Sequence, residues 1–182
     1  MSTNVNKGAT RENISATHNK SRLERLHKGR DIYIGIDIGS ISSDVVVMDK
    51  KGELLYSDYR RTMGGSLETI RDQLNELFKQ ISPSDVKLTA VTGSAGRFFA
   101  NLLELPFINE VPAQAAAIAK AYPDLDQASV IEMGGQDSKL IQLAREDDRL
   151  RMRDFTLNTG CAAGTGSFLD QQSARLGIDI EQ

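Results

Sequence analysis

Ile36-Asp37-Ile38-Gly39 and Ile131-Glu132-Met133-Gly134 are two copies of one short pattern, an apolar strand that carries an acid and then meets a glycine. The copies superpose without a gap, and Asp44 and Lys139 fall at the same position of each, followed by an apolar strand. Two copies of strand, acid, glycine turn and strand indicate duplicated lobes, with the two acids facing each other across a cleft.

Hydrophobic periodicity predicts a similar element order around both copies. In the first cycle we expect strands over 32–38, 45–48, 54–59 and 86–92, and helices over 67–80 (with Ser66 as N-cap), 97–104 and 112–121. In the second cycle we expect strands over 129–133, 140–144 and 149–155, and a helix over 167–176. The order βββαβα followed by βββα is typical of an α/β protein with two related lobes, the second of which stops early.

Three regions are expected along the chain. Residues 1–30 carry seven basic and two acidic side chains, a balance of +5 in a chain whose net charge is -3, and we expect them to form a solvated, disordered leader. Residues 31–122 form the first lobe with its connecting helix, and residues 123–182 begin the second lobe. Because two lobes of ordinary domain size need about 250 residues, the 182 residues are expected to be a fragment.

Composition excludes several classes of protein. Hydrophobic residues make up 40% and charged residues 26% of the chain, as in soluble globular proteins. No apolar run approaches the roughly 20 residues that span a bilayer, and the N-terminus lacks a signal-peptide core. The acidic body and the absence of aromatic side chains in the leader argue against nucleic acid. One cysteine allows no intrachain disulfide, so a cytoplasmic protein without membrane or nucleic-acid partners is predicted.

The repeated turns suggest a phosphate site. Successive backbone N–H groups in such a turn bind phosphate oxygens, and an acid on the preceding strand can hold a hydrated Mg²⁺ against them. Either turn alone is also explained as an ordinary hairpin, but the pair in register favours binding. Asp37 lies inside an apolar strand, where burying an unpaired carboxylate is costly, so a functional role is favoured for it.

Several stretches resemble known proteins. Residues 34–40 (IGIDIGS) and 131–139 (IEMGGQDSK) resemble the first and second phosphate motifs of the actin, hexokinase and Hsp70 ATPase superfamily. Residues 158–169 (NTGCAAGTGSFL), with the same Gly-Gly-Gln-Asp, resemble the ATPase activators of 2-hydroxyacyl-CoA dehydratases and benzoyl-CoA reductase subunits. Residues 92–97 and Asn109-Glu110 fit in the same order, so the resemblance covers about 32–178. It implies a ribonuclease H-like α/β fold with duplicated βββαβα lobes, the second truncated.

The resemblance also implies the chemistry: ATP hydrolysis coupled to low-potential electron transfer from a [4Fe–4S] cluster to a CoA-thioester dehydratase or reductase. Gln136 would orient the attacking water and Asp137 would be the assisting carboxylate. Two acids would position Mg²⁺ through water, and glycines and a serine would contact the phosphates of ATP or ADP. The cofactor-binding residues implied in this way are Asp37, Gly39, Ser40, Glu132, Gly134, Gly135, Gly164 and Gly166.

Cys161 is implied as a ligand of the [4Fe–4S] cluster. Such a cluster needs four thiolates and this chain supplies one, so either a further ligand lies beyond Gln182 or the cluster has been lost. The implied partners are a second copy of the chain or a second activator lobe, the CoA-ester dehydratase or reductase, and a low-potential electron donor.

The chain departs from the family pattern at two positions. Asp44 stands where the family often has lysine, and Ile41 replaces a hydroxyl residue of the first loop. Lys139 is interpreted either as a surface strand residue or as a phosphate ligand. Two other functions therefore stay open: a small-molecule kinase of the same superfamily, such as an amino-sugar kinase, and a non-catalytic nucleotide-sensing module.

Overall fold

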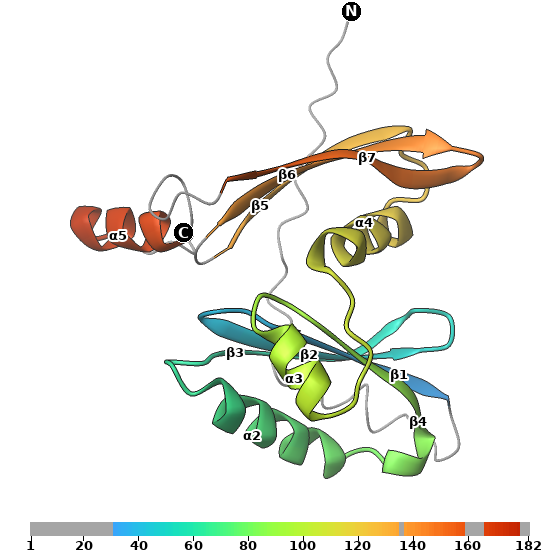
Figure 1. Ribbon diagram of the computed structural model, residues 1–182, viewed down its shortest axis with the longest axis vertical. Helices are drawn as coiled ribbons and strands as arrows, with labels where there is room; N and C mark the ends of the chain where they lie inside the picture. The colour runs from blue at the N-terminus through green and yellow to red at the C-terminus, as the bar shows by residue number, and fades with distance from the viewer. Residues whose placement is uncertain (1–30, 135–136, 159–165, 179–182) are drawn as a thin grey trace, which may run out of the picture.

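The computed structural model describes residues 31–134, 137–158 and 166–178, whose elements stack in layers (Figure 1). A three-stranded sheet lies on one side, followed by helix α4 (Glu110–Ala121) and then by a four-stranded sheet. Helices α2 (Ser66–Phe78) and α3 (Gly96–Leu102) cover the far face of the four-stranded sheet. Helix α4 thus lies between the two sheets.

The first sheet has the strand order β3-β2-β1-β4. Strand β1 pairs antiparallel with β2 and parallel with β4, which follows a short 3-10 turn, η1 (Pro83–Asp85). The predicted strands of this lobe are confirmed, with β2 and β3 longer than expected. Their bounds are β1 (Ile32–Ile38), β2 (Ser42–Asp49), β3 (Leu54–Arg61) and β4 (Val86–Thr92).

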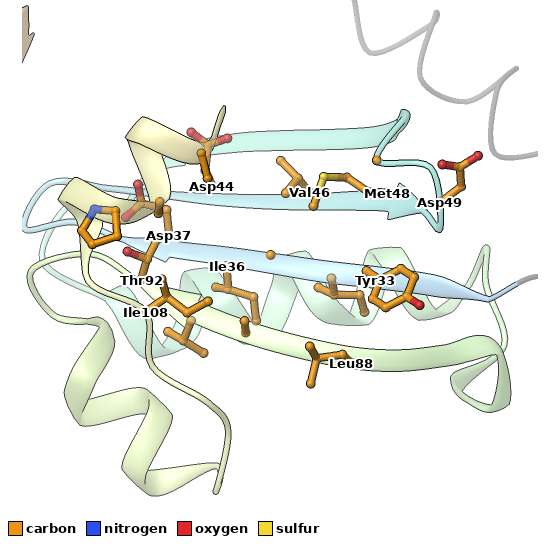
Figure 2. A pocket seen from close by; sticks show the side chains of 18 of the residues that line it. Tyr33, Ile36, Asp37, Asp44, Val46, Met48, Asp49, Leu88, Thr92 and Ile108 are labelled. Atoms are coloured by element: carbon orange, nitrogen blue, oxygen red, sulfur yellow. The ribbon is translucent and has the colours of Figure 1, made fainter. Parts of the chain in front are cut away.

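Strand β1 presents different chemistry to its two sides, because successive side chains of a strand point to opposite faces. Ile34, Ile36 and Ile38 are buried in the core that the sheet forms with α2 and α3. Tyr33, Gly35 and Asp37 alternate with them and face the α4 side (Figure 2). The alternation therefore directs the one acid of β1 away from the core.

Gln73 is a fully buried polar side chain between α2 and the first sheet. Its carbonyl oxygen accepts from the Ser43 hydroxyl at 2.7 Å, and its amide donates to the backbone carbonyls of Asp58 at 2.7 Å and Ser43 at 3.3 Å. Its side chain therefore satisfies polar groups of β2 and β3.

Replacing Gln73 by leucine is expected to lower the free energy of unfolding by about 2 kcal/mol, because buried polar partners lose their hydrogen bonds. Urea denaturation measures the change. Gln80→Leu is the matched control, since Gln80 is exposed and its side-chain amide donates one described hydrogen bond, to the carbonyl of Glu76. Equal stability of the two variants would contradict the assignment.

The start of α2 differs from the expectation that Ser66 caps the helix. Ser66 is the first helical residue, Gly65 occupies the N-cap, and no side chain caps this end. The Thr69 hydroxyl instead donates to the Gly65 carbonyl at 2.8 Å. The preceding residues Met63 and Gly64 have positive φ, so the chain turns sharply into the helix.

Helix α4 begins two residues earlier than predicted. Asn109 caps it, with its side chain accepting from the Val111 N–H at 3.0 Å, and Pro112 fits the first turn, where no intrahelical N–H bond is needed. The apolar face of α4 packs on the second sheet: Val111 and Ala115 share a buried cluster with Ile141, Leu143 and Leu150.

The second sheet is antiparallel throughout, with the order β5-β6-β7. Its strands are β5 (Gln127–Met133), β6 (Ser138–Glu146) and β7 (Arg149–Asn158), and helix α5 (Gly166–Leu176) follows. The predicted element order of the second lobe is confirmed. No helix within the described ranges is long and apolar enough to cross a membrane.

Candidate functional site

A cavity of about 150 Å³ lies between the two sheets, where β1 and β5 reach their glycines. Both lobes contribute to its lining. Six of the residues predicted from the sequence border it together: Asp37, Gly39, Ser40, Glu132, Gly134 and Asp137. The acids of the two copies therefore meet at one site, although they are far apart in the chain.

The two loops share one backbone hydrogen bond at their first residue. The Gly39 N–H donates to the Ser42 carbonyl at 2.9 Å, and the Gly134 N–H donates to the Asp137 carbonyl at 2.9 Å. The repeat seen in the sequence is therefore a repeat of backbone structure. Both glycine N–H groups are thus bonded within their own loops.

Gly134 lies close to two carboxylates of the site. A Cβ atom at this position would lie 2.9 Å from the Asp137 Oδ1 and 3.1 Å from the Glu132 Oε1. A larger residue at position 134 would therefore push one or both carboxylates away from the loop.

Asp37 lies among acids. On the first sheet it is paired with Asp44 of β2 and with Thr92 of β4. Burial, and then the negative charges of Glu110, Asp44 and Glu132, raise the pKa of Asp37 to about 6, which the positive charge of Lys139 only partly opposes. The folded protein therefore holds a proton on Asp37 more tightly than the unfolded chain does, and ionised Asp37 is costly.

This raised pKa predicts how stability depends on pH. Without Mg²⁺, the contribution of Asp37 to the free energy of unfolding should fall as pH rises from about 4 to about 6 and stay constant above, because the unfolded carboxyl ionises first. Asp37→Asn should be more stable than wild type at pH 7, and the difference should shrink toward pH 4. Urea titrations in a chelator measure it. An Asp37→Asn protein that loses stability at pH 7 would contradict the assignment.

Lys139 is the cation of the site. Its side chain is 8% exposed and its ammonium contacts Glu132 at 2.7 Å, Glu110 at 2.9 Å and Asp137 at 3.0 Å. Burial by itself would lower the pKa of Lys139, but the hydrogen bonds that its ammonium donates to the three carboxylates outweigh burial and raise the pKa above the usual range. Lys139 therefore stays charged and holds the N-terminal end of α4 against the loop after β5.

The site is suited to a hydrated divalent cation. Among the described lining residues, five carboxylates face one ammonium, that of Lys139, and an excess of negative oxygen ligands favours Mg²⁺. In the described part of the chain, no three His, Cys, Asp or Glu side chains are placed to hold a metal directly. The carboxylates bordering the cavity are Asp37, Asp44, Glu110, Glu132 and Asp137.

Two buried polar atoms add hydrogen-bonding capacity near Asp37. The Oγ1 of Thr92 and the Oε1 of Gln114 have no hydrogen-bond partner among the described residues. Gln114 borders the cavity one helical turn after Glu110. A ligand or its water could therefore bond to Gln114 from the α4 side.

A larger apolar groove of about 570 Å³ continues from the site along the first sheet, beneath α4 (Figure 2). Asp37, Asp44 and Thr92 lie at the end that it shares with the site, whereas Tyr33 and Leu88 lie at the other end. Asp37 and Asp44 therefore lie at the border between the polar cavity of the site and the apolar groove.

The remaining predicted site residues are not brought together by the described structure. Gly135, Gln136, Gly164 and Cys161 lie outside the described residues, as does the predicted leader. Gly166 is the first residue of α5.

Sequence reasoning gave no site role to Gln114, which also borders the cavity. Ser94 borders it too and lies in the glycine-rich turn 92–97, a candidate anion-binding turn by sequence that is equally explained as an ordinary strand-to-helix turn. The sequence left the role of Lys139 open, and it gave Glu110 as the start of a segment that links the lobes and lines either the cleft or a dimer interface, or that is simply a packed helix. The sequence did contain one indication of a role for Lys139. Lys139 and Asp44 occupy the same position of the two copies, so the repeat predicts that both side chains face the cleft. The ion pair between Glu110 and Lys139 depends on how α4 packs, which the repeat does not specify.

Comparison with known proteins identifies the family. The profile of the BadF/BadG/BcrA/BcrD ATPase family matches residues 34–182. The activator of lactoyl-CoA dehydratase from Anaerotignum propionicum is 30% identical over 151 residues, 82% of this chain and 55% of that protein.

Two solved structures are similar to this one. The activator of 2-hydroxyisocaproyl-CoA dehydratase from Clostridium difficile, with bound ADPNP, superposes with a TM-score of 0.68 at 28% identity, covering 82% of this chain and 53% of that one. Component A of (R)-2-hydroxyglutaryl-CoA dehydratase from Acidaminococcus fermentans has a TM-score of 0.68 at 26% identity, covering 82% and 55%. The chain spans about half the length of these relatives. The predicted α/β fold class and family are confirmed, and the chain belongs to the BadF/BadG/BcrA/BcrD ATPase family.

Proposed function

We propose that this chain is the phosphate-binding part of an ATP-dependent activator, which couples ATP hydrolysis to low-potential electron transfer from a [4Fe–4S] cluster to a CoA-thioester dehydratase or reductase. The observation that carries the proposal is the pair of equivalent loops, each closed by the same glycine N–H bond, that meet at one cavity with an acid before each. Named relatives activate CoA-ester dehydratases, and one solved relative holds an ATP analogue.

Phosphate binding at this site requires Mg²⁺. The β- and γ-phosphates carry negative charge into a cavity that already holds more carboxylates than cations, so their approach is repulsive without a divalent ion. Asp37 and Glu132 would hold a hydrated Mg²⁺ from opposite lobes. Ser40 offers its hydroxyl and backbone N–H to the phosphates, and Gly135 offers its backbone N–H from the second loop.

In the proposed hydrolysis, neighbouring residues of the second loop have different roles. Gln136 orients the attacking water, because its amide both donates and accepts hydrogen bonds. Asp137 assists as a carboxylate, and its bond to Lys139 at 3.0 Å keeps its Oδ1 toward the ammonium. Glu110, bonded to the same ammonium, would link the loop after β5 to α4 when the nucleotide changes.

Isothermal titration with ADPNP tests the nucleotide site. We expect binding in Mg²⁺ that disappears in EDTA and in the Asp37→Asn variant, because a neutral amide holds the hydrated ion poorly. Asp72→Asn is the control, since Asp72 lies on the exposed side of α2 in an ion pair with Arg71. Affinity that is the same with and without Mg²⁺ would overturn the proposed site.

The electron-transfer part of the proposal depends on Cys161. A [4Fe–4S] cluster held by thiolates supplies one-electron chemistry at low potential, and two copies of this chain would contribute two of its four ligands. Iron and sulfide analysis after anaerobic purification tests it. We expect Cys161→Ala to lose iron while binding ADPNP in Mg²⁺ normally. Wild-type protein without iron or sulfide would refute the cluster and leave the nucleotide site standing.

A further inference from the structure

We propose that Gln114 of helix α4 is a further positioning residue for the hydrated Mg²⁺ of the nucleotide site, and that its side-chain oxygen accepts a hydrogen bond from a water of that ion. The inference rests on the proposed function, since it concerns the same cation. It adds a contact from the helix between the two sheets to the contacts of Asp37 in the first lobe and Glu132 in the second.

The side chain of Gln114 carries a buried acceptor that is not used. Gln114 borders the cavity of about 150 Å³ between the two sheets, and its Oε1 is buried without a hydrogen-bond partner among the described residues. A buried acceptor left unsatisfied destabilises the folded state, because it has lost its hydrogen bonds to water and gained none in return. A donor that enters the cavity would therefore bind favourably to Gln114.

The chemistry of the cavity indicates which donor this is. The three hydrogens of the Lys139 ammonium are already directed to Glu110, Glu132 and Asp137. The phosphate oxygens of a nucleotide are acceptors, so they cannot satisfy the oxygen of Gln114. Mg²⁺ usually keeps several waters when it binds phosphates, and a bound cation makes the O–H groups of its waters stronger donors. The hydrated ion is therefore the part of the ligand that matches Gln114.

The packing of α4 holds Gln114 beside the cavity. Val111 and Ala115 lie on the face of α4 that packs on the second sheet, which fixes the rotation of the helix. Glu110 and Gln114 are four residues apart and share another face, and both border the cavity. The ion pair between Glu110 and Lys139 at 2.9 Å fixes the first turn of the helix. Gln114 is thus positioned by contacts of its neighbours.

A residue that positions the ion and a residue that only stabilises the fold respond differently to substitution. Gln114→Met retains an unbranched side chain of similar helix propensity and removes the acceptor. In EDTA we expect Gln114→Met to unfold at a higher urea concentration than wild type, because the unsatisfied buried oxygen is gone. A glutamine that serves only to stabilise the packing of α4 would give a lower midpoint when replaced.

Isothermal titration with ADPNP in saturating Mg²⁺ measures the second effect. We expect Gln114→Met to bind about tenfold more weakly than wild type, as for the loss of one hydrogen bond to a charged group. Gln114→Glu retains an oxygen acceptor, so it should bind ADPNP more tightly than Gln114→Met does. In EDTA, however, Gln114→Glu should be less stable than wild type, because it adds a carboxylate to a cavity whose described lining already holds five.

Gln142→Met is the matched control. Gln142 is an exposed glutamine of β6 that lies between the buried Ile141 and Leu143, so its side chain points to the sheet face opposite α4. Gln142→Met should equal wild type in urea midpoint in EDTA and in affinity for ADPNP.

Two results would overturn the role of Gln114 alone: wild-type affinity for ADPNP in Gln114→Met, or a lower urea midpoint of Gln114→Met in EDTA. If the wild-type chain itself fails to bind ADPNP in Mg²⁺, the nucleotide site is refuted and the role of Gln114 with it. The wild-type titration therefore distinguishes failure of the proposed function from failure of this inference.

Discussion

Replacing Lys139 by methionine is expected to lower the free energy of unfolding by about 3 kcal/mol, because it leaves three carboxylates around a buried position without their cation. The estimate takes the lower end of the range for broken buried ion pairs, since these carboxylate side chains remain 23% to 35% exposed. Urea denaturation at pH 7 in a chelator measures the loss.

A matched lysine separates the cluster from a general effect of charge removal. Lys87 makes one surface pair with Asp31 at 3.3 Å, and both side chains are about half exposed, so Lys87→Met should change stability by less than about 1 kcal/mol. Adding Glu132→Gln to Lys139→Met should restore part of the loss, because one uncompensated charge is removed. Equal stability of Lys139→Met and Lys87→Met would show that the ion pairs of Lys139 contribute nothing to the free energy of unfolding.

A Gly93→Ala variant is expected to be destabilised by about 3 kcal/mol, from a positive φ and from overpacking. Gly93 has φ +98, and a Cβ there would lie 2.3 Å from the Ile38 carbonyl oxygen and 2.4 Å from the Asp37 Oδ1. The end of β1 must move to make room, and Asp37 moves with it. Titration with ADPNP and Mg²⁺ should therefore also show weakened binding.

Gly64→Ala isolates the cost of the backbone conformation. Gly64 has φ +87, and a Cβ there would meet nothing within 4 Å, so only the left-handed conformation is penalised, by about 1 kcal/mol. Nucleotide binding by this control should be unchanged. If Gly93→Ala and Gly64→Ala have the same free energy of unfolding and the same affinity for ADPNP, the close approach of Gly93 to Asp37 contributes neither to stability nor to nucleotide binding.

Much of the candidate site could be predicted because its residues follow a local pattern. The sequence Ile36-Asp37-Ile38-Gly39 specifies alternation and a turn, and both are properties of neighbouring residues. The second copy then placed Glu132 opposite Asp37, since duplicated lobes face each other. The observed Gly39 and Gly134 hydrogen bonds show that the repeat extends to the backbone.

The ends of helices were predicted less well. Asn109 starts α4 through a side-chain bond to Val111, and the periodicity of apolar residues gave only the later part of the helix. At α2, Ser66 is a strong capping residue by type, yet the positive φ of Met63 and Gly64 sets the entry of the chain so that Gly65 becomes the N-cap. The conformation of the loop before α2 thus determined which residue occupies the N-cap of that helix.

The sequence by itself determined the α/β order of elements, the family, and the pairing of Asp37 with Glu132 as acids of one cleft, because these depend on local spacing and on an internal repeat. Only the tertiary structure decided that Lys139 is buried among Glu110, Glu132 and Asp137, and that Ile131 and Met133 are bare where Ile36 and Ile38 are covered. Burial and charge pairing depend on which elements pack together over long distances in the chain, and no local pattern encodes that choice.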